Sequence, residues 1–117
     1  MVHVIFIYMM ERRLANFLGF EEVISFSSGF AANLAAFGTL CREGDIVLCN
    51  TLNHQSIVDG LQLSDAKIVN YRHASPRSIE ACLKRSPYEQ RKFIVTDGMF
   101  SMDGDVAPLP DIVKLAE

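Results

Sequence analysis

Short apolar runs separated by polar turns recur along the chain from residue 22 onward. The runs are rich in Val, Ile and Phe, as buried strands are, and they predict strands at residues 23–26, 46–49, 67–71 and 92–96. Between them, apolar side chains recur at helical spacing, which predicts helices at residues 29–40, 57–63 and 109–117 and another from Pro76, behind Ser75. Strands that alternate with helices favour an α/β fold whose mostly parallel sheet is covered by helices on both faces.

The first ten residues do not follow this rhythm. Residues 4–8 favour a strand by propensity, yet they run without a turn signal into residues 11–19, where the apolar spacing predicts a helix. Residues 1–10 are apolar but too short to span a bilayer, and they lack the basic start and cleavage site of a signal peptide. We therefore interpret residues 1–10 as an atypical N-terminal segment and expect no membrane attachment.

The composition restricts the class of protein. With 117 residues, half of them hydrophobic, the chain can bury one modest core and is not disordered. Its net charge of -3 argues against nucleic acid as a partner. The cysteines form no CxxC pair and lie in or beside predicted buried elements, as reduced cytoplasmic thiols commonly do; they are Cys41, Cys49 and Cys82.

A strand-to-helix turn at residues 27–29 offers a site for an anion. Ser27, Ser28 and Gly29 lead into an Ala-rich helix, whose first backbone N–H groups lie at the positive end of the helix dipole. Small side chains let a phosphate or carboxylate approach the backbone, and a serine there could cap the helix or bond the anion. A plain capped turn without a ligand is the alternative for this stretch.

Three polar loops follow predicted strands, at residues 27–29, 50–56 and 97–105. Because the carboxyl ends of parallel strands meet at one edge of a sheet, we expect the three loops to open on the same edge. The second loop offers an imidazole, His54, and the third offers oxygen donors at Asp97, Ser101, Asp103 and Asp105.

Two other chemical readings of these residues are less favoured. The acidic loop lacks the spacing and the closing Glu of an EF-hand, so we expect no metal site there. His73 has no polar cluster beside it in the sequence, and we interpret it as a surface residue.

Three motifs in the chain resemble those of a known enzyme family. They are SSGFAANL at residues 27–34, HQSIVDG at residues 54–60 and VTDGMFSMDGDVAPL at residues 95–109. In this order they resemble the α-oxoamine synthases, pyridoxal-phosphate (PLP) enzymes with the fold-type I, aspartate-aminotransferase-like architecture. The resemblance covers residues 11–117, and it implies that they form the N-terminal part of the three-layer α/β/α major domain that binds PLP.

The resemblance also implies roles for individual residues. Ser28 would contribute to the cofactor site, and the backbone N–H groups of Gly29 and Phe30 would hold the cofactor phosphate. His54 would be the catalytic residue that stacks on the pyridine ring and positions substrate. Ser101 would bond the phenolic oxygen of the cofactor, and Asp97 would support the substrate side. Asn33 would be a buried structural polar residue.

The activity implied by the resemblance is the PLP-dependent condensation of an amino acid, glycine or alanine, with an acyl-CoA to give an aminoketone. Glycine C-acetyltransferase (2-amino-3-ketobutyrate CoA ligase) and 8-amino-7-oxononanoate synthase are the leading candidates, and Asp97 in place of Glu leans toward the former. Relatives of this family are homodimers, so a cytoplasmic homodimer is the expectation for a complete enzyme.

The positions of the lysines lead us to expect that the chain is a fragment and inactive alone. The Schiff-base lysine of the family would lie beyond residue 117, since no lysine of this chain stands in a Ser/Thr-rich loop before a glycine; the lysines are Lys67, Lys84, Lys92 and Lys114. In relatives, moreover, the strand equivalent to residues 23–26 lies apart from the next three, so we expect it to be detached from a three-stranded sheet.

Two alternatives remain open. One is a non-catalytic partner subunit or pseudoenzyme of the same fold, which lacks the Schiff-base lysine. The other is an unrelated α/β nucleotide-binding module, which the missing G-x-G-x-x-G motif disfavours.

Overall fold

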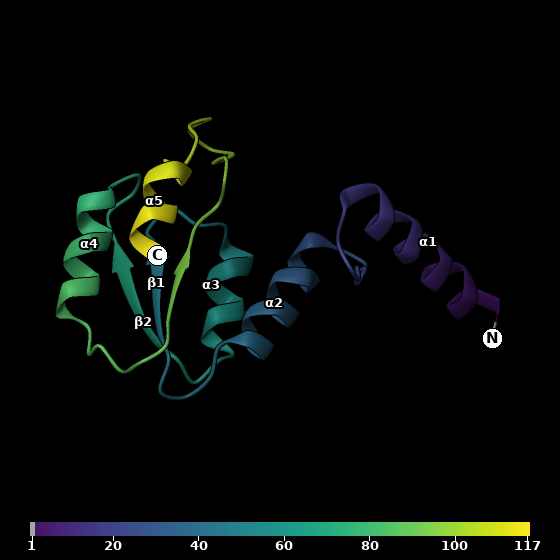
Figure 1. The fold of residues 1–117 in the computed structure, drawn as a ribbon, viewed down its shortest axis with the longest axis horizontal. Coiled ribbons are helices and arrows are strands. Elements are labelled where there is room, and N and C mark those ends of the chain that lie inside the picture. The colour runs from purple at the N-terminus through teal and green to yellow at the C-terminus, as the bar shows by residue number, and fades with distance from the viewer. Residues whose placement is uncertain (1) are drawn as a thin grey trace. The chain divides into compact units, whose positions relative to one another are not determined.

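A computed structural model describes residues 2–117, with side chains described from Val4 onward. The chain divides into two compact units, of which the first ends at Ala32 and the second covers Asn33–Glu117. The elements in chain order are α1 (Val2–Leu18), α2 (Gly29–Leu40), β1 (Ile46–Asn50), α3 (Gln55–Gln62), β2 (Lys67–Tyr71), α4 (Pro76–Arg85), β3 (Lys92–Val95) and α5 (Leu109–Ala116), as Figure 1 shows.

The second unit is built on a three-stranded parallel sheet with the order β2-β1-β3. Ile46, the first residue of β1, is in register with Lys67 of β2 on one side and with Lys92 of β3 on the other. The amino ends of the strands therefore meet at one edge of the sheet and their carboxyl ends at the opposite edge. The sequence prediction of a mostly parallel α/β fold is confirmed.

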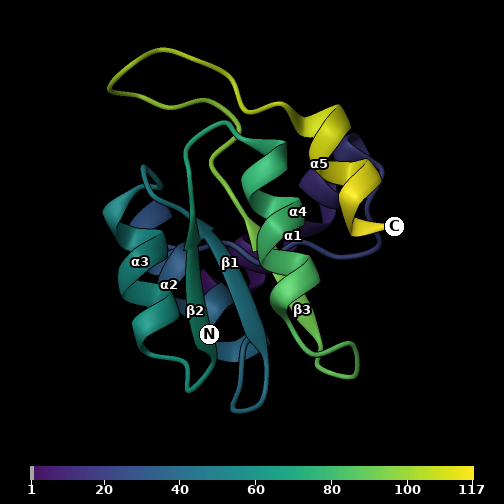
Figure 2. The same cartoon turned by 90° about the vertical axis from the view of Figure 1, so that its left-hand side faces the viewer.

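Alternate residues of the central strand β1 face two separate cores, one on each side of the sheet. Ile46 and Leu48 pack with residues of α4 and α5, among them Ile79 and Ile112. Val47 and Cys49 pack on the other side with Ile57 and Leu61 of α3 and with Phe37 of α2. Helices thus cover both faces of the sheet, as Figures 1 and 2 show, and all five residues of β1 are buried.

The strand predicted at residues 23–26 is wrong. These residues have no regular secondary structure, and the described sheet contains only β1, β2 and β3. The backbone N–H and the hydroxyl of Ser25 both donate to the Glu11 carboxylate, each at 2.7 Å. A strand exists only by pairing with a neighbour, and residues 23–26 have none in the described chain. The described sheet has the three strands that were expected of it, and the fourth strand, which was expected to lie apart from them, is not formed.

The N-terminal segment is helical and not a strand. One continuous helix, α1, includes residues 4–8 and most of the helix predicted at residues 11–19. The strand propensity of residues 4–8 is overridden because a helix satisfies its backbone hydrogen bonds within one segment, whereas a lone strand cannot.

Most of the other predicted elements match the structure to within two residues. Helix α3 begins at Gln55 and not at residue 57, and β3 ends at Val95 and not at residue 96. The predicted cap of α4 is present, because the Ser75 hydroxyl accepts a hydrogen bond from the N–H of Ser78 at 3.3 Å.

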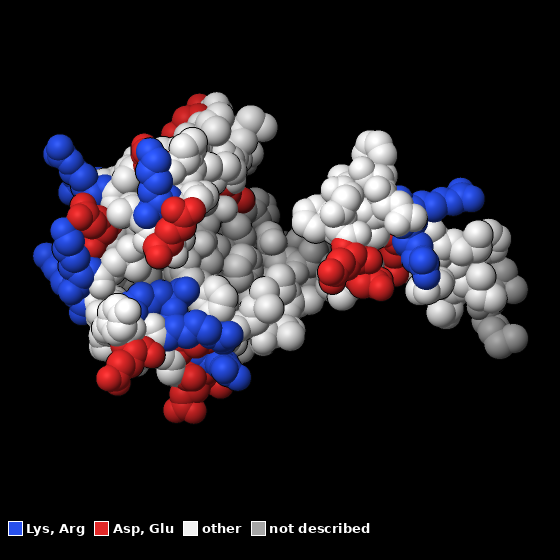
Figure 3. Space-filling view, viewed as in Figure 1, with Lys and Arg blue, Asp and Glu red and all other residues white. Residues whose placement is uncertain are grey.

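On the face shown in Figure 3, Lys and Arg side chains are interspersed with Asp and Glu. Among the described residues, no helix combines the length and the apolar character that a membrane crossing needs.

Candidate functional site

Two polar loops extend from the carboxyl ends of neighbouring strands. Residues 51–54 follow β1, and residues 96–108 follow β3, which pairs directly with β1. Figures 1 and 2 show the second of these loops projecting beyond the sheet. Because the strands are parallel, both loops leave the same edge, as the sequence predicted for these two. The third predicted loop, at residues 27–29, follows no strand, so that part of the prediction is wrong.

Three polar residues join these two loops. The buried amide of Asn53 donates from Nδ2 to the carbonyl of Val95 and accepts at Oδ1 from the N–H of Asp97, both at 2.9 Å. The backbone N–H of His54 in turn donates to Oδ2 of Asp97 at 2.7 Å. Two predicted site residues, His54 and Asp97, are therefore in direct contact, and Asn53, which was not predicted as a site residue, holds the loops together.

Ser101 lies in a tight turn of the third polar loop. The turn is closed by hydrogen bonds from the Phe100 N–H to the Asp105 carbonyl, at 2.9 Å, and from the Gly104 N–H to the Phe100 carbonyl, at 2.8 Å. Gly104 has a φ of 71°, in the left-handed region that glycine adopts without strain. Ser101 is exposed, so its hydroxyl is accessible at the outer end of the loop.

His73 is not the isolated surface residue that the sequence suggested. Its Nε2 lies 2.6 Å from Oδ2 of Asp105, and its Nδ1 lies 3.2 Å from Oδ1 of Asn50. The ring also packs in a T-shaped arrangement with the ring of Phe100, with a centroid separation of 4.4 Å. His73 therefore anchors the loop that carries Ser101 to the ends of β1 and β2. Its place just after the strand at residues 67–71 was the sequence signal that could have revealed this role.

Two ionisable side chains, Cys49 and Tyr71, are buried beneath these loops. Asn53 Nδ2 contacts Cys49 Sγ at 3.3 Å, and the Tyr71 hydroxyl donates to the carbonyl of Val95 at 3.3 Å. Burial raises the pKa of both the Cys49 thiol and the Tyr71 phenol above their ordinary values. Both groups are therefore neutral near pH 7.

The turn before α2 belongs to the first unit. Ser28 caps the helix, because its Oγ accepts from the N–H of Ala31 at 3.1 Å. Gly29 and Phe30 are the first two helical residues, so their N–H groups have no acceptor within the helix. A methyl group added at Gly29 would meet no atom within 4 Å. The space beside these N–H groups is open, which suits an approaching anion.

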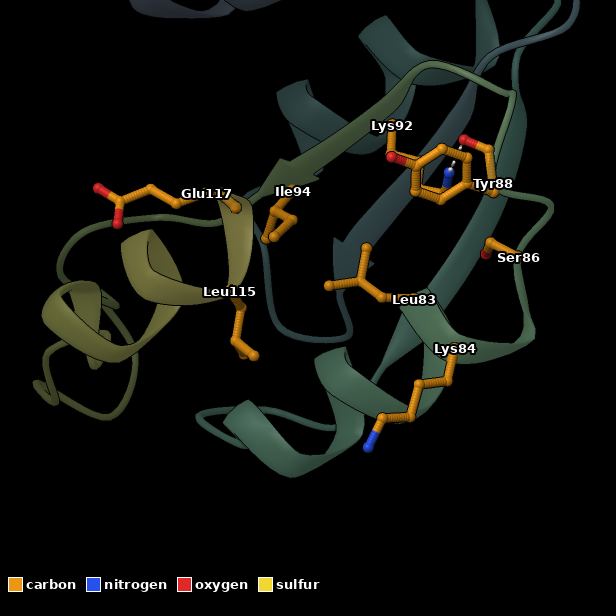
Figure 4. A pocket seen from close by; sticks show the side chains of 9 residues that line it. Leu83, Lys84, Ser86, Tyr88, Lys92, Ile94, Leu115 and Glu117 are labelled. Carbon is orange, nitrogen blue, oxygen red and sulfur yellow. Dashed lines mark hydrogen bonds between the residues drawn. The ribbon is translucent and has the colours of Figure 1, made fainter.

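The lysines lie away from the carboxyl edge. Lys67 and Lys92 are the first residues of β2 and β3, at the amino edge of the sheet. The ammonium group of Lys92 donates to the carbonyls of Pro87, Tyr88 and Gln90 beside a groove of about 500 Å³, drawn in Figure 4. Lys84 and Lys114 are on helices and pair with Glu80 and Asp111 of the same helices. Within the described residues, no cluster of three or more metal-binding side chains was found.

The sequence matches the aminotransferase class I and II family over residues 4–117. The chain belongs to this family. An 8-amino-7-oxononanoate synthase from Thermoanaerobacter pseudethanolicus is 48% identical over 109 residues, which are 92% of this chain and 28% of that protein. The chain thus spans little more than a quarter of the length of this relative.

Solved structures give the same assignment. A serine palmitoyltransferase variant from S. paucimobilis, with a bound PLP–myriocin aldimine, is 40% identical with a TM-score of 0.86; the match covers 91% of this chain and 28% of that one. An 8-amino-7-oxononanoate synthase from Francisella tularensis is 34% identical with a TM-score of 0.78, over 93% and 31% of the two chains. These proteins are α-oxoamine synthases, so the family and the fold-type I class predicted from the motifs are confirmed.

Proposed function

We propose that this chain forms part of the PLP-binding major domain of an α-oxoamine synthase. Such an enzyme would condense glycine or alanine with an acyl-CoA to give an aminoketone. The observation that carries the proposal is the direct bond between His54 and Asp97, because it joins the loops of two family motifs at one edge of the sheet. The 8-amino-7-oxononanoate synthase relatives support this substrate class, although Asp97 had suggested glycine C-acetyltransferase.

The residues present fit the phosphate group of PLP. We assign its binding to the N–H groups of Gly29 and Phe30 and to the hydroxyl of Ser28, because the first turn of α2 is open and unobstructed. When bound, PLP would supply an electron sink for the electrons released at the amino acid Cα.

The second unit would supply the groups that act on the ring and the substrate. His54, which is exposed at the start of α3, would stack on the pyridine ring and keep it oriented. Ser101 would donate its hydroxyl hydrogen to the phenolic oxygen. Asp97 would support the substrate side while its Oδ2 fixes the backbone of His54.

The proposal extends to the oligomeric state and the cellular compartment of the protein. We propose a homodimer in the cytoplasm, with acyl-CoA and amino acid substrates as its ligands.

Substituting Gly29 tests the phosphate site directly. Gly29→Ala places a methyl group beside the N–H groups of the first turn without meeting any protein atom, so the fold should remain intact. The affinity for PLP, measured by equilibrium titration, should fall roughly tenfold, which corresponds to about 1.4 kcal/mol. Pyridoxal, which lacks the phosphate, should bind weakly to both proteins and with equal affinity.

Gly38→Ala is the matched control for this test. It adds a methyl group to the same helix, far from its first turn, and the nearest atom would be Leu63 Cβ at 3.7 Å, an ordinary contact. PLP affinity should not change in this variant. Equal binding of PLP and pyridoxal to the unsubstituted chain would refute the phosphate site.

A further inference from the structure

The hydrogen bonds around His54 determine which of its ring nitrogens carries the proton. Nδ1 of His54 faces the backbone N–H of Ser56 at 3.2 Å and the Ser56 hydroxyl oxygen at 2.7 Å. A backbone N–H can only donate, so Nδ1 must act as the acceptor and is unprotonated. In a neutral imidazole the other nitrogen then carries the hydrogen, which is Nε2.

A third residue determines the direction of the Ser56 hydroxyl. The side-chain amide of Asn33 donates from Nδ2 to the Ser56 oxygen at 2.8 Å. Because that oxygen accepts from Asn33, its own hydrogen is free to point at Nδ1 of His54. Ser56 is only 1% exposed, so water cannot readily replace either bond. Asn33, Ser56 and His54 thus form a chain of hydrogen bonds with one consistent direction.

The position of Asn33 is set by close packing against α3. A Cβ atom added at Gly60 would lie 2.8 Å from the carbonyl oxygen of Asn33 and 3.2 Å from Cα of Leu34. Only glycine permits this approach, which brings the backbone at residues 33–34 onto α3. The approach holds the Asn33 amide beside Ser56, one turn before Gly60.

We propose that Ser56 and Asn33 are positioning residues that fix His54 as its Nε2–H tautomer and set the plane of its ring. His54 consequently presents a hydrogen-bond donor, and not a proton acceptor, on the side of the ring away from α3. This deepens the proposed function, on which it rests for the use of His54. On this proposal, the His54 ring stacks on the ligand and donates a hydrogen bond from Nε2. The neutral ring in this tautomer cannot abstract a proton through Nε2.

The imidazole tautomer can be measured without cofactor by long-range ¹H–¹⁵N NMR of the uniformly ¹⁵N-labelled chain. The spectra are recorded at pH 8, above the ordinary histidine pKa of about 6.5. In the unsubstituted chain, His54 should show an unprotonated Nδ1 and a protonated Nε2. In Ser56→Ala only the longer bond from the backbone N–H of residue 56, at 3.2 Å, remains, so both nitrogen shifts should move part of the way toward the averaged values of free histidine, which exchanges between tautomers. Ser56→Thr, which keeps the hydroxyl, should restore the single tautomer.

A second variant and a matched control distinguish a specific change at His54 from a general loss of structure. Asn33→Asp keeps the shape of the side chain but turns the donor into an acceptor, which draws the Ser56 hydrogen away and should also move the His54 shifts. Ser64→Ala removes another hydroxyl near the end of α3, bonded to the Leu61 carbonyl at 2.6 Å, and should leave His54 unchanged. The His73 signals report an intact fold, because that ring is bonded to Asn50 and Asp105.

Two results would overturn the proposal: a proton on Nδ1 in the unsubstituted chain, or unchanged His54 shifts in folded Ser56→Ala and Asn33→Asp. Failure of the proposed function would look different. In that case PLP would not bind to the unsubstituted chain in titrations, while the tautomer and its response to the variants would remain as described.

Discussion

At the residue scale, the chemistry proposed for the second unit centres on His54. Its backbone is bonded to Asp97 and its ring to Ser56, so both parts of the residue are held while the side chain remains exposed. A ring that is fixed on one side and open on the other is suited to stack on a planar ligand. The proposed phosphate site at Gly29 and Phe30 would use backbone groups and would not depend on this side chain.

Replacing His54 should therefore separate binding from catalysis. In His54→Ala, PLP should still bind through its phosphate, while turnover of an enzyme that contains this chain should fall by orders of magnitude. PLP titration and steady-state kinetics measure the two effects. Gln55→Ala, a change at the exposed neighbour bonded to Asp59, is the control and should affect neither. Unchanged turnover in His54→Ala would make His54 a loop residue without a catalytic role.

At the scale of elements, an ion pair joins the amino ends of β1 and β3. Arg91 donates from Nε and Nη2 to the two carboxylate oxygens of Asp45, at 2.9 and 2.6 Å. The Asp45 side chain is 6% exposed and also accepts from the N–H of Arg42. The hydrogen bonds from Arg91 hold the pKa of Asp45 below its ordinary value. The two residues come directly before the strands, so the pair fixes the spacing of their first residues.

This ion pair should make stability depend on pH in the acid range. A carboxylate whose pKa is lowered by folding stabilises the native state above its unfolded pKa of about 3.9, and this contribution is lost as pH falls through the folded pKa. Asp45→Asn should lower the urea midpoint at pH 7 and flatten the decline of stability below about pH 4. Denaturation series at several pH values measure both effects.

Asp111→Asn is the control for this prediction. Asp111 is 59% exposed and lies 3.6 Å from Lys114, so its loss should change the urea midpoint little. If Asp45→Asn and Asp111→Asn behaved alike at pH 7, the pair with Arg91 would have no special role in holding the strands.

At the scale of the whole molecule, the described residues include unpaired strand edges and exposed apolar side chains. Strands β2 and β3 each pair with β1 on one side only, so both have a free edge in the described sheet. Helix α1 exposes apolar side chains around its circumference, including Phe6 at 67% and Phe17 at 85%. Surfaces of this kind promote association between chains.

The isolated chain should therefore self-associate. Size-exclusion chromatography with light scattering should show oligomers or aggregates whose fraction rises with concentration. Phe17→Glu should reduce this association, because it places a charge within the apolar surface of α1. Tyr88→Glu changes a side chain that is 97% exposed in the turn before β3, outside α1, and it should have no effect. A monodisperse monomer with a cooperative thermal transition would contradict this prediction.

The local elements could be predicted from the sequence because their signals are local. The apolar runs at β1, β2 and β3 and the Ser75 cap act within a few residues, and the structure confirms them. The rule that parallel strands end at one edge was sufficient to predict that the loops after β1 and β3 would leave the sheet together. The three motifs were specific enough to predict the family.

Only the tertiary structure determined which residues far apart in the sequence contact one another. Residues 23–26 have the composition of a strand but form none, because strand formation requires a partner that propensity cannot supply. His73 meets Asp105 across 32 residues, and Asn33 meets Ser56 across 23. These bonds depend on where the sheet brings the loops and on how closely α2 approaches α3 at Gly60. No local pattern encodes those distances, since they arise only when the elements pack against one another.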